Sequence, residues 1–423
     1  MNILILGSGG REHTFCWKLS QSPKCQNLYV SPGNAGTAAI ATNLGIPVLD
    51  FKSIKVAVIK NNIQMVIVGP EAPLVEGIKE FFQSDSQLSK VSLIGPNSEA
   101  AKLEGSKSFA KKFMNKYKIP TAKYSEFTSS SLSQAFEFLE TMTPPYVLKA
   151  DGLAGGKGVL IIEDIDKAKK ELKSMLLNRK FGKASEKVVI EEFLNGIELS
   201  CFIISDGKTG ITFPMAKDYK KIGEADTGLN TGGMGAVSPV PFVDIEFQKK
   251  IDEKIIKPTL RGLKSENMLY QGFIFIGLIN VDGEPMVIEY NVRMGDPETE
   301  VVIPRIKNDF VSLFQAVSNQ NLKTIKLKID KRVAVTVMSV SGGYPEKYNK
   351  GYAIKGLENI KDAIIFHSGT IIEGDKVLTN GGRVLTLTGL GNSMQEALKK
   401  SYKGLKEIQF KGMYYRNDIG FDL

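Results

Sequence analysis

Short apolar runs separated by stretches of helical pattern occupy the first hundred residues. Each run ends beside glycine, serine or proline, and the runs are Ile3–Leu6, Leu28–Val30, Met65–Val68 and Val91–Ile94. Such runs are typical of strands that are buried on both faces of a parallel sheet. Their alternation with helices predicts βαβ units, and therefore an α/β fold with a doubly wound parallel sheet.

The rest of the chain divides into two further parts. From about residue 106 to 315, longer strands surround a glycine-rich central region. From about residue 330, an alternating strand at Arg332–Val340 is followed by turn-rich strands and a helix near Ser393–Ile408. The pattern therefore predicts three parts, of which the last is small and mixes strands with a helix.

One strand of the middle part ends in polar residues. The apolar run Pro285–Ile288 leads into Glu289, Asn291 and Arg293, which the period of two places on one face. A carboxylate, an amide and a guanidinium are costly to bury without partners. Mg²⁺ with bound phosphate would supply partners, because the oxygens suit the cation and the guanidinium suits phosphate. A structural Glu–Arg pair is the alternative interpretation.

Glycine-rich loops follow several predicted strands of the first part. The turn Gly7–His13 is similar to a dinucleotide fingerprint, but Glu12 stands where the third glycine is required. The turn still offers backbone N–H groups to a phosphate monoester, and Arg11 lies beside them. Ligands of α/β sheets gather at such strand ends, where residues 31–36, 69–73 and 95–96 form similar loops. Simple tight turns are the alternative.

The middle part contains a glycine-rich hairpin. The strand Tyr146–Asp151 carries Lys149 near its end and runs through residues 152–158 into a second strand, Val159–Ile162. This is not a Walker A loop, since no Gly-Lys-Ser/Thr opens a helix. A flexible hairpin with bare amides and a lysine can fold over a triphosphate and exclude water. An ordinary hairpin loop is the alternative.

Acidic residues follow two further strands. After the apolar run at 188–190, a carboxylate could accept the exocyclic amine of adenine, Phe193 or Leu194 could cover the ring, and Glu198 could reach a ribose hydroxyl. Plain solvation of these acids is the alternative. Asp296 and Glu298 are placed to hold an ammonium group, just after the polar strand end.

The segment Asn230–Gly235 is rich in glycine and polar residues. Its composition excludes a place in the core. It is either a disordered linker or a mobile substrate loop that becomes ordered on binding.

Composition excludes several classes of protein. The net charge of +9 comes from scattered lysines without a basic tail or interleaved aromatic residues, which favours a solvated lysine-rich surface over nucleic-acid binding. The charge also suits anionic small substrates. Three cysteines without a CxxC pair and two histidines argue against disulfides and zinc. The N-terminus is typical of a strand and not of a signal peptide, and no apolar run reaches the roughly 20 residues of a membrane helix. We expect a cytoplasmic protein without membrane partners.

In their order and spacing, these motifs resemble the ATP-grasp ligases and, within them, the phosphoribosylamine–glycine ligase (GAR synthetase) family. The resemblance runs nearly from end to end. The segments that carry it are 9–13, 32–36, 69–74, 103–107, 149–154, 156–158, 230–235, 295–299, 342–345 and 380–384.

The resemblance implies a three-domain architecture. We expect a Rossmann-like substrate domain at 1–105, an α+β ATP-grasp domain at 106–315 with a mobile lid at about 121–192, and a C-terminal domain at 316–423. The implied reaction is the ATP-dependent ligation of glycine to 5-phosphoribosylamine through glycyl phosphate, in purine biosynthesis. Mg²⁺ or Mn²⁺ and a monomeric enzyme are also implied.

The resemblance also implies roles for individual residues. Glu289 and Asn291 would bind the metal, and Arg293 would be the catalytic residue that stabilises the transferring phosphoryl group. The implied ATP contacts are Lys107, Lys149, Gly155, Gly156, Lys157, Gly158, Glu191, Glu192, Phe193, Leu194 and Glu198. The implied substrate contacts are Gly9, Gly10, Arg11, Glu71, Asp218, Asn230, Thr231, Gly232, Gly233, Gly295, Asp296, Glu298 and Arg383. A protein nucleophile is not expected, because phosphoryl transfer needs positioning and charge neutralisation.

The chain departs from the family pattern in three places. Asp218-Tyr219-Lys220-Lys221 stands where the family has Asp-His-Lys-Arg, so no acid–base role is assigned to Tyr219, and Lys221 lacks the arginine fork. Gly155 replaces an alanine, which should loosen the hairpin. The strand Tyr270–Ile279 lacks the acid that related enzymes place before the metal strand, so water and phosphate oxygens would complete the metal shell.

Three alternatives remain from the sequence. One is a sibling ATP-grasp ligase, such as a purine-pathway carboxylase or a formate-dependent enzyme. Another is a non-catalytic nucleotide-binding protein, which would have no need of the intact Glu289, Asn291 and Arg293. A nicotinamide-dependent oxidoreductase is disfavoured by Glu12.

Overall fold

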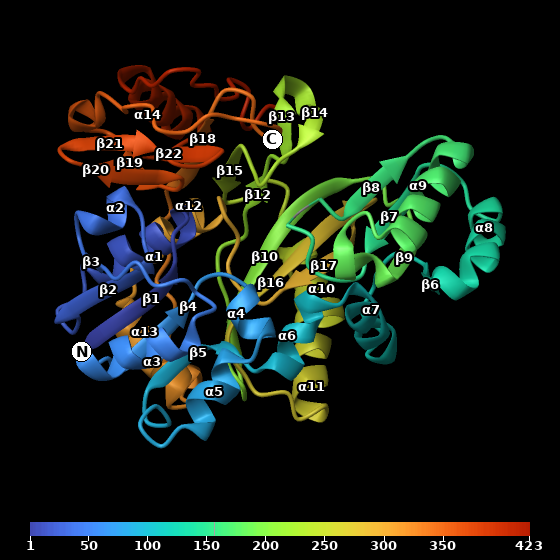
Figure 1. Cartoon of the computed structure of the whole chain (residues 1–423), viewed down its shortest axis with the longest axis horizontal. Helices are drawn as coiled ribbons and strands as arrows, with labels where there is room; N and C mark the ends of the chain where they lie inside the picture. The colour runs from blue at the N-terminus through green and yellow to red at the C-terminus, as the bar shows by residue number, and fades with distance from the viewer. Residues whose placement is uncertain (156) are drawn as a thin grey trace.

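The structure is a computed structural model that describes residues 1–155 and 157–423. Its largest element is a nine-stranded sheet in the order β11-β10-β16-β5-β4-β1-β2-β3, in which β17 also pairs with β16 (Figure 1). The strands are β1 (Asn2–Gly7), β2 (Asn27–Pro32), β3 (Thr42–Asn43), β4 (Met65–Val68), β5 (Ser92–Pro96), β10 (Ile197–Asp206), β11 (Gly210–Thr212), β16 (Tyr270–Val281) and β17 (Glu284–Asn291).

The N-terminal half of this sheet is parallel, which confirms the prediction of βαβ units. Strands β1 to β5 pair with parallel neighbours, and the side chains from Ile3 to Leu6 are fully buried. Hydrophobic clusters cover both faces, so these strands need continuous apolar runs. The connecting helices are α1 (Gly10–Leu19), α2 (Ala35–Ala38), α3 (Phe51–Lys60), α4 (Ala72–Val75), α5 (Ile78–Ser84) and α6 (Ser98–Gly105).

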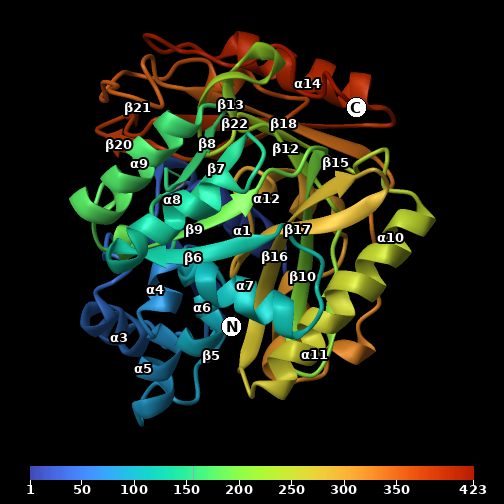
Figure 2. The ribbon, with the colours of Figure 1, turned by 90° about the vertical axis from the view of Figure 1, so that its right-hand side faces the viewer.

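The other half of the sheet is antiparallel and joins the first half at a narrow seam. Strand β16 pairs with β5 only through Tyr270 with Pro96 and Gln271 with Gly95. It then pairs with β10 and β17 along most of its length. Helices α10 and α11 run alongside β10 and β16 (Figure 2). The helices of this part are α7 (Lys107–Lys116), α10 (Ile245–Ile251), α11 (Lys257–Ser265), α12 (Thr299–Val302) and α13 (Phe310–Ser318).

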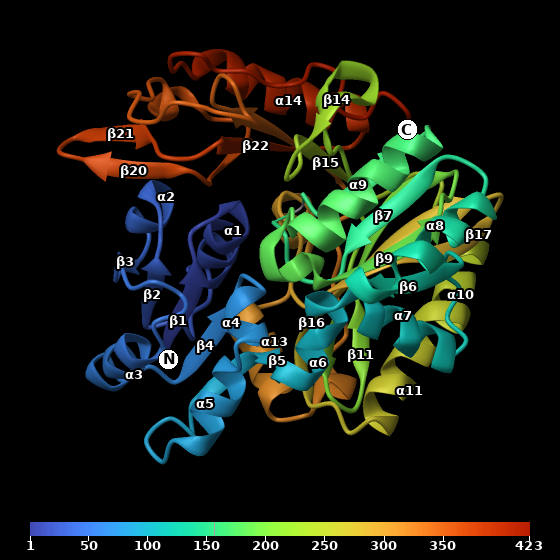
Figure 3. The ribbon, with the colours of Figure 1, turned by 45° about the vertical axis from the view of Figure 1, so that its right-hand side comes forward.

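A separate four-stranded sheet stands beside α7. Its order is β6-β9-β7-β8, and it has its own hydrophobic core with helices α8 and α9 (Figure 3). The glycine-rich hairpin joins β7 to β8, as the sequence predicts. The elements are β6 (Tyr124–Thr128), α8 (Leu132–Glu140), β7 (Tyr146–Ala150), β8 (Val159–Ile162), α9 (Ile165–Asn178) and β9 (Lys187–Glu192).

A five-stranded sheet in the order β12-β15-β18-β22-β19 forms the layer above the N-terminal strands (Figure 1). Its first two strands come from the middle of the chain. The strands and helix are β12 (Lys217–Asp218), β15 (Gly235–Ser238), β18 (Val333–Val340), β19 (Ile364–His367), β22 (Arg383–Gly391) and α14 (Met394–Glu407). Two hairpins accompany them, β13 (Lys221–Gly223) with β14 (Thr227–Asn230) and β20 (Thr370–Glu373) with β21 (Lys376–Thr379).

An alternating pattern such as that of β18 usually gives a strand one solvent-exposed face, but β18 has none. Its residues from Ala334 to Val340 are all buried, because α14 packs on the strand and α12 also contacts it. The polar position Thr336 is satisfied inside the sheet, where its hydroxyl accepts a hydrogen bond from Thr388 at 2.9 Å. Within residues 1–155 and 157–423, no helix has the length and apolarity that crossing a bilayer requires.

Candidate functional site

The three polar residues at the end of β17 lie together, as the period of two predicts. The Asn291 amide donates to Glu289 Oε1 at 3.4 Å, and Arg293 Nη2 donates to Asn291 Oδ1 at 3.2 Å. The strand itself ends at Asn291, and Arg293 continues the same face just beyond it. Two oxygen ligands and one guanidinium are therefore adjacent at one strand end.

Arg293 is held by two carboxylates from the N-terminal part. Its Nε lies 3.2 Å from Glu71 Oε2, and its Nη2 lies 2.8 Å from Glu104 Oε1. The other Glu104 oxygen accepts the Val292 N–H at 2.7 Å. Burial raises the pKa of Glu104 to about 7 although Arg293 opposes the shift. Glu104 therefore fixes both the guanidinium and the backbone beside it.

Glu104 was not among the residues assigned from the sequence. It lies in the segment 103–107, one of those that carry the family resemblance, but its contact with Arg293 depends on how α6 packs on β17. The only local indication of a role for Glu104 was an acidic residue on the buried side of a helix.

Cationic side chains surround Glu289. Burial alone would raise its pKa, but Lys107, Lys220 and Lys149 together hold the pKa below its ordinary value. The Glu289 carboxylate is therefore ionised at neutral pH and able to bind a cation. The charges that stabilise it also suit a polyphosphate.

A divalent cation fits the donor set at this strand end. Glu289 and Asn291 supply adjacent hard oxygen ligands, which Mg²⁺ and Mn²⁺ prefer. Among the residues that the structure describes, no group of three or more His, Cys, Asp or Glu side chains is arranged to hold a metal. The protein therefore offers two ligands, which is sufficient for a metal that also binds water and phosphate oxygens.

Lys149 and Glu191 form a buried ion pair next to this cluster. Lys149 Nζ lies 2.9 Å from Glu191 Oε2 and 3.3 Å from the Ile288 carbonyl oxygen. Lys111 Nζ binds the same Glu191 oxygen at 2.9 Å. Lys111 is a second residue that the sequence did not single out, because it lies on α7, far along the chain from Glu191.

The other predicted nucleotide contacts follow β9. Glu192 Oε1 accepts the Lys123 N–H at 2.9 Å, and the Phe193 side chain is 40% exposed. Leu194 is half-buried, and Glu198 forms an ion pair with Lys220. An exposed aromatic ring beside a strand end is available to pack against a ligand.

The predicted hairpin loop lies between β7 and β8. Gly155 has a positive φ of +56° and Lys157 is exposed, whereas Gly158 is buried. Gly156 lies outside the described residues. The Lys107 N–H donates to the Asp151 carbonyl oxygen at 3.1 Å, so the base of the hairpin is tied to the start of α7.

The Tyr219 side chain contacts the C-terminal residues. Its hydroxyl donates to Asp422 Oδ1 at 2.9 Å, and Lys217 Nζ lies 4.1 Å from the centre of its ring. Tyr219 is 1% exposed and packs near Phe421. A tyrosine at this position is therefore part of the packing between β12 and the C-terminal residues.

Asp218 and Lys220, which flank Tyr219, do face the cluster. Lys220 forms its ion pair with Glu198 and lies 3.8 Å from Asp218 Oδ1. Burial raises the pKa of Asp218, although Lys220 opposes the shift. Lys221 takes part through its backbone, since its carbonyl oxygen accepts Arg416 Nη1 at 3.1 Å.

In the glycine-rich turn after β1, Glu12 accepts hydrogen bonds from the turn itself. Glu12 Oε2 accepts the Gly9 N–H at 2.6 Å, and Glu12 Oε1 accepts Arg11 Nε at 2.6 Å. Arg11 Nη1 also donates to the Met294 carbonyl oxygen at 3.1 Å. Glu12 thus occupies the turn where a dinucleotide fingerprint needs a third glycine. The turn is joined directly to the segment after β17.

Asp296 connects that turn to the C-terminal sheet. Asp296 Oδ2 accepts the Arg11 N–H at 3.2 Å, and Asp296 Oδ1 lies 3.0 Å from Arg383 Nη1. Burial would raise the pKa of Asp296, but Arg383 and Arg11 hold it below the ordinary value. Arg383 Nη1 also donates to the Gly232 carbonyl oxygen at 2.8 Å. Asp296 is thus an ionised anchor with two cationic partners.

Glu298 has a different environment from Asp296. It is 3% exposed, and its Oε1 accepts the Ser200 hydroxyl at 3.1 Å. Burial, and then Asp218, raises the pKa of Glu298 to about 7. Gly295 lies against this carboxyl and has no room for a side chain.

The remaining predicted substrate residues lie on the loop between β14 and β15. Asn230 is exposed at the end of β14, and Thr231 Oγ1 donates to the Lys220 carbonyl oxygen at 2.8 Å. The Gly233 N–H donates to Thr231 Oγ1 at 2.9 Å. The loop is therefore ordered by its own hydrogen bonds and lies between Lys220 and Arg383. The prediction that this segment lies outside the core is wrong for its second half, because the apolar side chain of Met234 is fully buried in the hydrophobic cluster of the C-terminal sheet.

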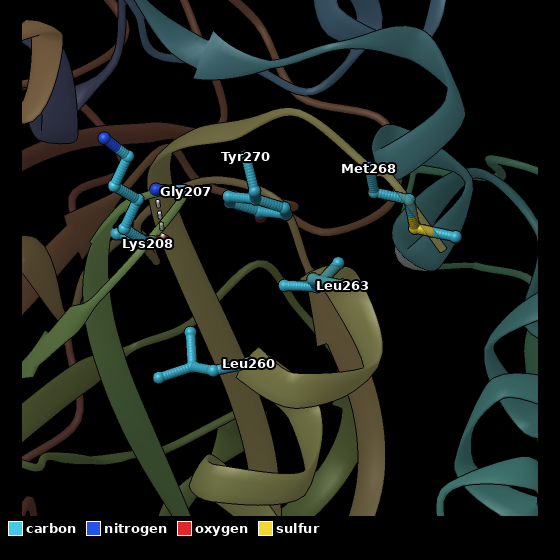
Figure 4. Close-up of a pocket in the computed structure, with 7 residues that line it drawn as sticks. Gly207, Lys208, Leu260, Leu263, Met268 and Tyr270 are labelled. Carbon is cyan, nitrogen blue, oxygen red and sulfur yellow. Dashed lines mark hydrogen bonds between the residues drawn. The ribbon is translucent and has the colours of Figure 1, made fainter. Parts of the chain in front are cut away.

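Two cavities among the described residues lie elsewhere. The one in Figure 4 has about 10 Å³ of space, room for a single water molecule, and is lined by Tyr270, Leu260 and Leu263 among others. A shallow groove of about 280 Å³ is lined by Phe213, Met215 and Val240 among others. Neither is lined by a predicted site residue, so the cluster around Glu289 is the stronger candidate on its chemistry.

Three family models match successive parts of the chain. The Phosphoribosylglycinamide synthetase N domain matches residues 1–104, the ATP-grasp (A) domain residues 105–299 and the C domain residues 334–422. The phosphoribosylamine–glycine ligase of Caldanaerobacter subterraneus subsp. tengcongensis is 42% identical over 419 residues, which cover 99% of each chain.

Solved structures agree with this match. The phosphoribosylamine–glycine ligase from Thermotoga maritima has a TM-score of 0.86 at 36% identity, covering 99% of this chain and 100% of that one. The biotin carboxylase domain of a Hydrogenobacter thermophilus 2-oxoglutarate carboxylase, solved with MgADP and bicarbonate, has a TM-score of 0.72 at 13% identity, covering 98% of this chain and 91% of that one. This second likeness concerns the fold alone. The chain therefore belongs to the phosphoribosylglycinamide synthetase family of ATP-grasp proteins.

Proposed function

We propose that this enzyme ligates glycine to 5-phosphoribosylamine at the expense of ATP, giving glycinamide ribonucleotide, ADP and phosphate in purine biosynthesis. The observation that carries the proposal is the group formed by Glu289, Asn291 and Arg293 among Lys107, Lys149 and Lys220, in a chain that matches the family along nearly all its length. In the first step, a glycine carboxylate oxygen attacks the γ-phosphorus and ADP leaves. In the second, the amine of phosphoribosylamine attacks the carbonyl carbon of glycyl phosphate, and phosphate leaves.

Glu289 and Asn291 would hold Mg²⁺ or Mn²⁺, which would neutralise phosphate charge when bound. Their adjacency at 3.4 Å and the ionised state of Glu289 support this role. Lys107 and Lys149 would contact the ATP phosphates. Among the described residues, Lys149 has hydrogen-bond acceptors for two of its three N–H groups, so one is available for a phosphate oxygen.

Arg293 would stabilise the transferring phosphoryl group. Nε, one N–H of Nη1 and both N–H of Nη2 have partners at 2.8 to 3.3 Å within the described part of the chain, which leaves a single N–H for the ligand. These contacts hold the guanidinium charge of Arg293 in place before the reaction begins. Electrostatic stabilisation is most effective when the charged group does not have to move during the reaction.

The nucleotide would lie between the four-stranded sheet and β17. The residues proposed to contact it are Gly155, Gly156, Lys157, Gly158, Glu191, Glu192, Phe193, Leu194 and Glu198. The exposed loop residues Gly155 and Lys157 would cover the phosphates, and the 40% exposed ring of Phe193 would cover the base. Closure of this sheet over ATP would exclude water from glycyl phosphate.

The two small substrates would lie toward the N- and C-terminal parts. Glu298 would hold the ammonium group of glycine, with Asp218, Gly295 and Asp296 nearby. The residues proposed for phosphoribosylamine are Gly9, Gly10, Arg11, Glu71, Asn230, Thr231, Gly232, Gly233 and Arg383. Because Asp296 already binds Arg11 and Arg383, we assign it chiefly to the positioning of these two arginines.

The direct test is an omission assay. ADP release is measured with ATP, glycine and freshly prepared phosphoribosylamine, and each is left out in turn. We expect release to require glycine and full turnover to require all three. Release that ignores glycine would contradict the proposed reaction and favour a sibling ATP-grasp ligase.

The metal role has its own test. Glu289→Ala should abolish metal-dependent turnover, a loss of at least about a thousandfold, because the remaining amide is a weak ligand alone. The variant should stay folded by circular dichroism. Retained activity at saturating Mg²⁺ would refute the role of Glu289 as a ligand.

We further propose the limits 1–105, 106–315 and 316–423 for the three domains, with a mobile lid at about 121–192. A monomeric enzyme that works in the cytoplasm is part of the same proposal. Analytical ultracentrifugation of the purified protein would test the oligomeric state, and a sedimenting dimer at micromolar concentration would contradict it.

A further inference from the structure

Lys111 is a buried cation that the proposed mechanism does not use. Its side chain is 2% exposed, and Nζ lies 2.9 Å from Glu191 Oε2. Nζ also donates to Thr121 Oγ1 at 2.8 Å and lies 3.4 Å from the Ala122 carbonyl oxygen. The ammonium group of Lys111 has three N–H donors, and each has one of these protein acceptors. Lys111 therefore has no donor left for a ligand.

The two oxygens of the Glu191 carboxylate have different environments. Its Oε2 receives both Lys111 and Lys149 at 2.9 Å. Its Oε1 is buried and has no hydrogen-bond partner among residues 1–155 and 157–423. A bare buried acceptor is unfavourable unless a donor arrives. Because two cations hold Oε2 from different elements, the carboxylate cannot rotate, and Oε1 is the oxygen left for that donor.

We propose that Lys111 is a positioning residue that sets the nucleotide selectivity of this enzyme by fixing the orientation of Glu191. The proposal rests on the proposed function only in taking a purine nucleoside triphosphate as the ligand. The 6-amino group of adenine donates a hydrogen bond to Glu191 Oε1. The 6-oxo group of hypoxanthine is an acceptor, which would face a bare carboxylate oxygen and be repelled.

Removal of Lys111 changes this arrangement in two ways. Glu191 is then held by Lys149 alone and can turn, so its preference for a donor at position 6 weakens. Lys149 would then be the only cation paired with Glu191 among these residues. The stronger attraction to Glu191 would draw the Lys149 ammonium group away from the phosphates. Burial lowers the pKa of Lys111 to about 8, so the side chain is still charged at neutral pH. The loss is therefore the loss of a charge and not only of a hydrogen bond.

The chain offers a matched control on the same helix. Lys112 is the next residue of α7, but its side chain is 63% exposed and pairs with Glu126 at 3.0 Å. Lys111→Met and Lys112→Met remove the same charge from the same helix. Lys111→Arg keeps the charge and serves as the conservative variant.

The test compares ATP with inosine triphosphate. Kd is measured for both by titration calorimetry without glycine or phosphoribosylamine, and KM and kcat are measured in the full reaction. For Lys111→Met we expect the Kd and KM for ATP to rise roughly tenfold, the ATP preference to fall by a similar factor, and kcat to change less. Lys112→Met should match the wild type, and Lys111→Arg should recover part of the preference.

A folded Lys111→Met protein with the wild-type preference for ATP would overturn the proposal. If that variant does not fold, Thr121→Val removes one acceptor of Lys111 and keeps its charge. It should reduce the ATP preference in the same direction by a smaller factor, and an unchanged preference would again overturn the proposal. The binding arm is independent of the ligase reaction, so absent glycine-dependent turnover would refute the proposed function and leave the role of Lys111 testable.

Discussion

Glu298 combines a buried carboxyl with a proposed role, binding the ammonium group of glycine, that needs a negative charge. Burial and Asp218 raise its pKa to about 7, so much of the free enzyme carries a neutral Glu298 near pH 6.5. The ammonium group of glycine would bind the ionised form and shift the equilibrium toward it. The affinity for glycine therefore reports the protonation state of one residue.

We predict that the KM for glycine falls as pH rises from 6 to 8. Glu298→Gln should raise this KM by roughly tenfold at pH 8 and remove most of its pH dependence, because a neutral amide cannot pair with the ammonium group. The measurement is KM for glycine against pH at saturating ATP. A wild-type KM that does not change over this range would contradict the assignment of Glu298.

Glu300, two residues on, is fully buried, and neither carboxyl oxygen has a partner in the part of the chain that the structure describes. Burial and Asp296 raise its pKa well above the ordinary value of 4.5. The folded protein therefore binds a proton that the unfolded chain releases above about pH 4.5. The stability that this proton provides is complete below that pH and is lost as pH rises toward the folded pKa.

Glu300→Gln should remove this pH-dependent loss. We expect the variant to have a higher Tm than the wild type at pH 8 and a nearly equal Tm at pH 5. Thermal unfolding at both pH values, followed by circular dichroism, gives the difference. A variant that is less stable at pH 8 would show that Glu300 is ionised in the folded protein.

Local periodicity predicted the contact of Glu289, Asn291 and Arg293, because residues two apart on one strand share a face. The same reasoning could not find Glu104 or Lys111. Their partners lie on other elements, so the contacts exist only after α6 and α7 pack against the strands. The orientation of Tyr219 was also beyond sequence reasoning, since a pattern gives the chemistry of a side chain but not which neighbour it faces.

At the scale of elements, the hairpin β13–β14 is fastened to the C-terminal residues. Arg416 is fully buried, and it binds Asp226 at 2.6 Å and Asp418 at 2.7 Å. Asp418 also accepts the Ala225 N–H at 2.6 Å. The hairpin leads directly into the loop at 230–233, so these ion pairs determine where that loop begins. The sequence predicted the loop but not its attachment.

Arg416→Met should therefore loosen the hairpin. Breaking a buried ion pair from one side costs about 3–5 kcal/mol, but Asp226 is 42% exposed, so we expect roughly 2 kcal/mol in the free energy of unfolding. Urea unfolding measures this loss, and limited proteolysis should show earlier cleavage near residues 224–230. Lys411→Met, on the same C-terminal segment, is the control and should leave both unchanged. Wild-type stability in Arg416→Met would contradict the account.

At the scale of the whole molecule, the long sheet depends on the close approach of two glycines. A Cβ at Gly272 would lie 2.9 Å from the Cα of Gly95, so the backbones of β16 and β5 meet without side chains between them. Lys79 supports the seam, because its Nζ donates to the carbonyl oxygens of Leu93 and Gly95 at 3.0 and 3.1 Å. This seam sets the distance between Arg293 and the N-terminal residues that hold it.

Gly272→Val should force the two halves of the sheet apart. We expect a loss of about 3 kcal/mol or more in the free energy of unfolding and a fall in kcat, because Glu71 and Glu104 would no longer reach Arg293 together. Gly283→Ala is a comparison for backbone strain away from the seam, since that glycine has open space around it but a φ of +82°. It should cost about 1 kcal/mol in the free energy of unfolding and leave kcat unchanged. Full activity in a folded Gly272→Val protein would show that the seam does not position the site.

The membership of β12 and β15 in the C-terminal sheet limits how this protein can be divided or recombined. A gene segment encoding residues 316–423 alone would lack two of the five strands and would leave the edge of β18 unpaired. Exchange of this layer between related genes would have to carry residues 217–238 as well. The unit that evolution can transplant is therefore a pair of separated segments, and partial duplications cut near residue 316 should yield insoluble products.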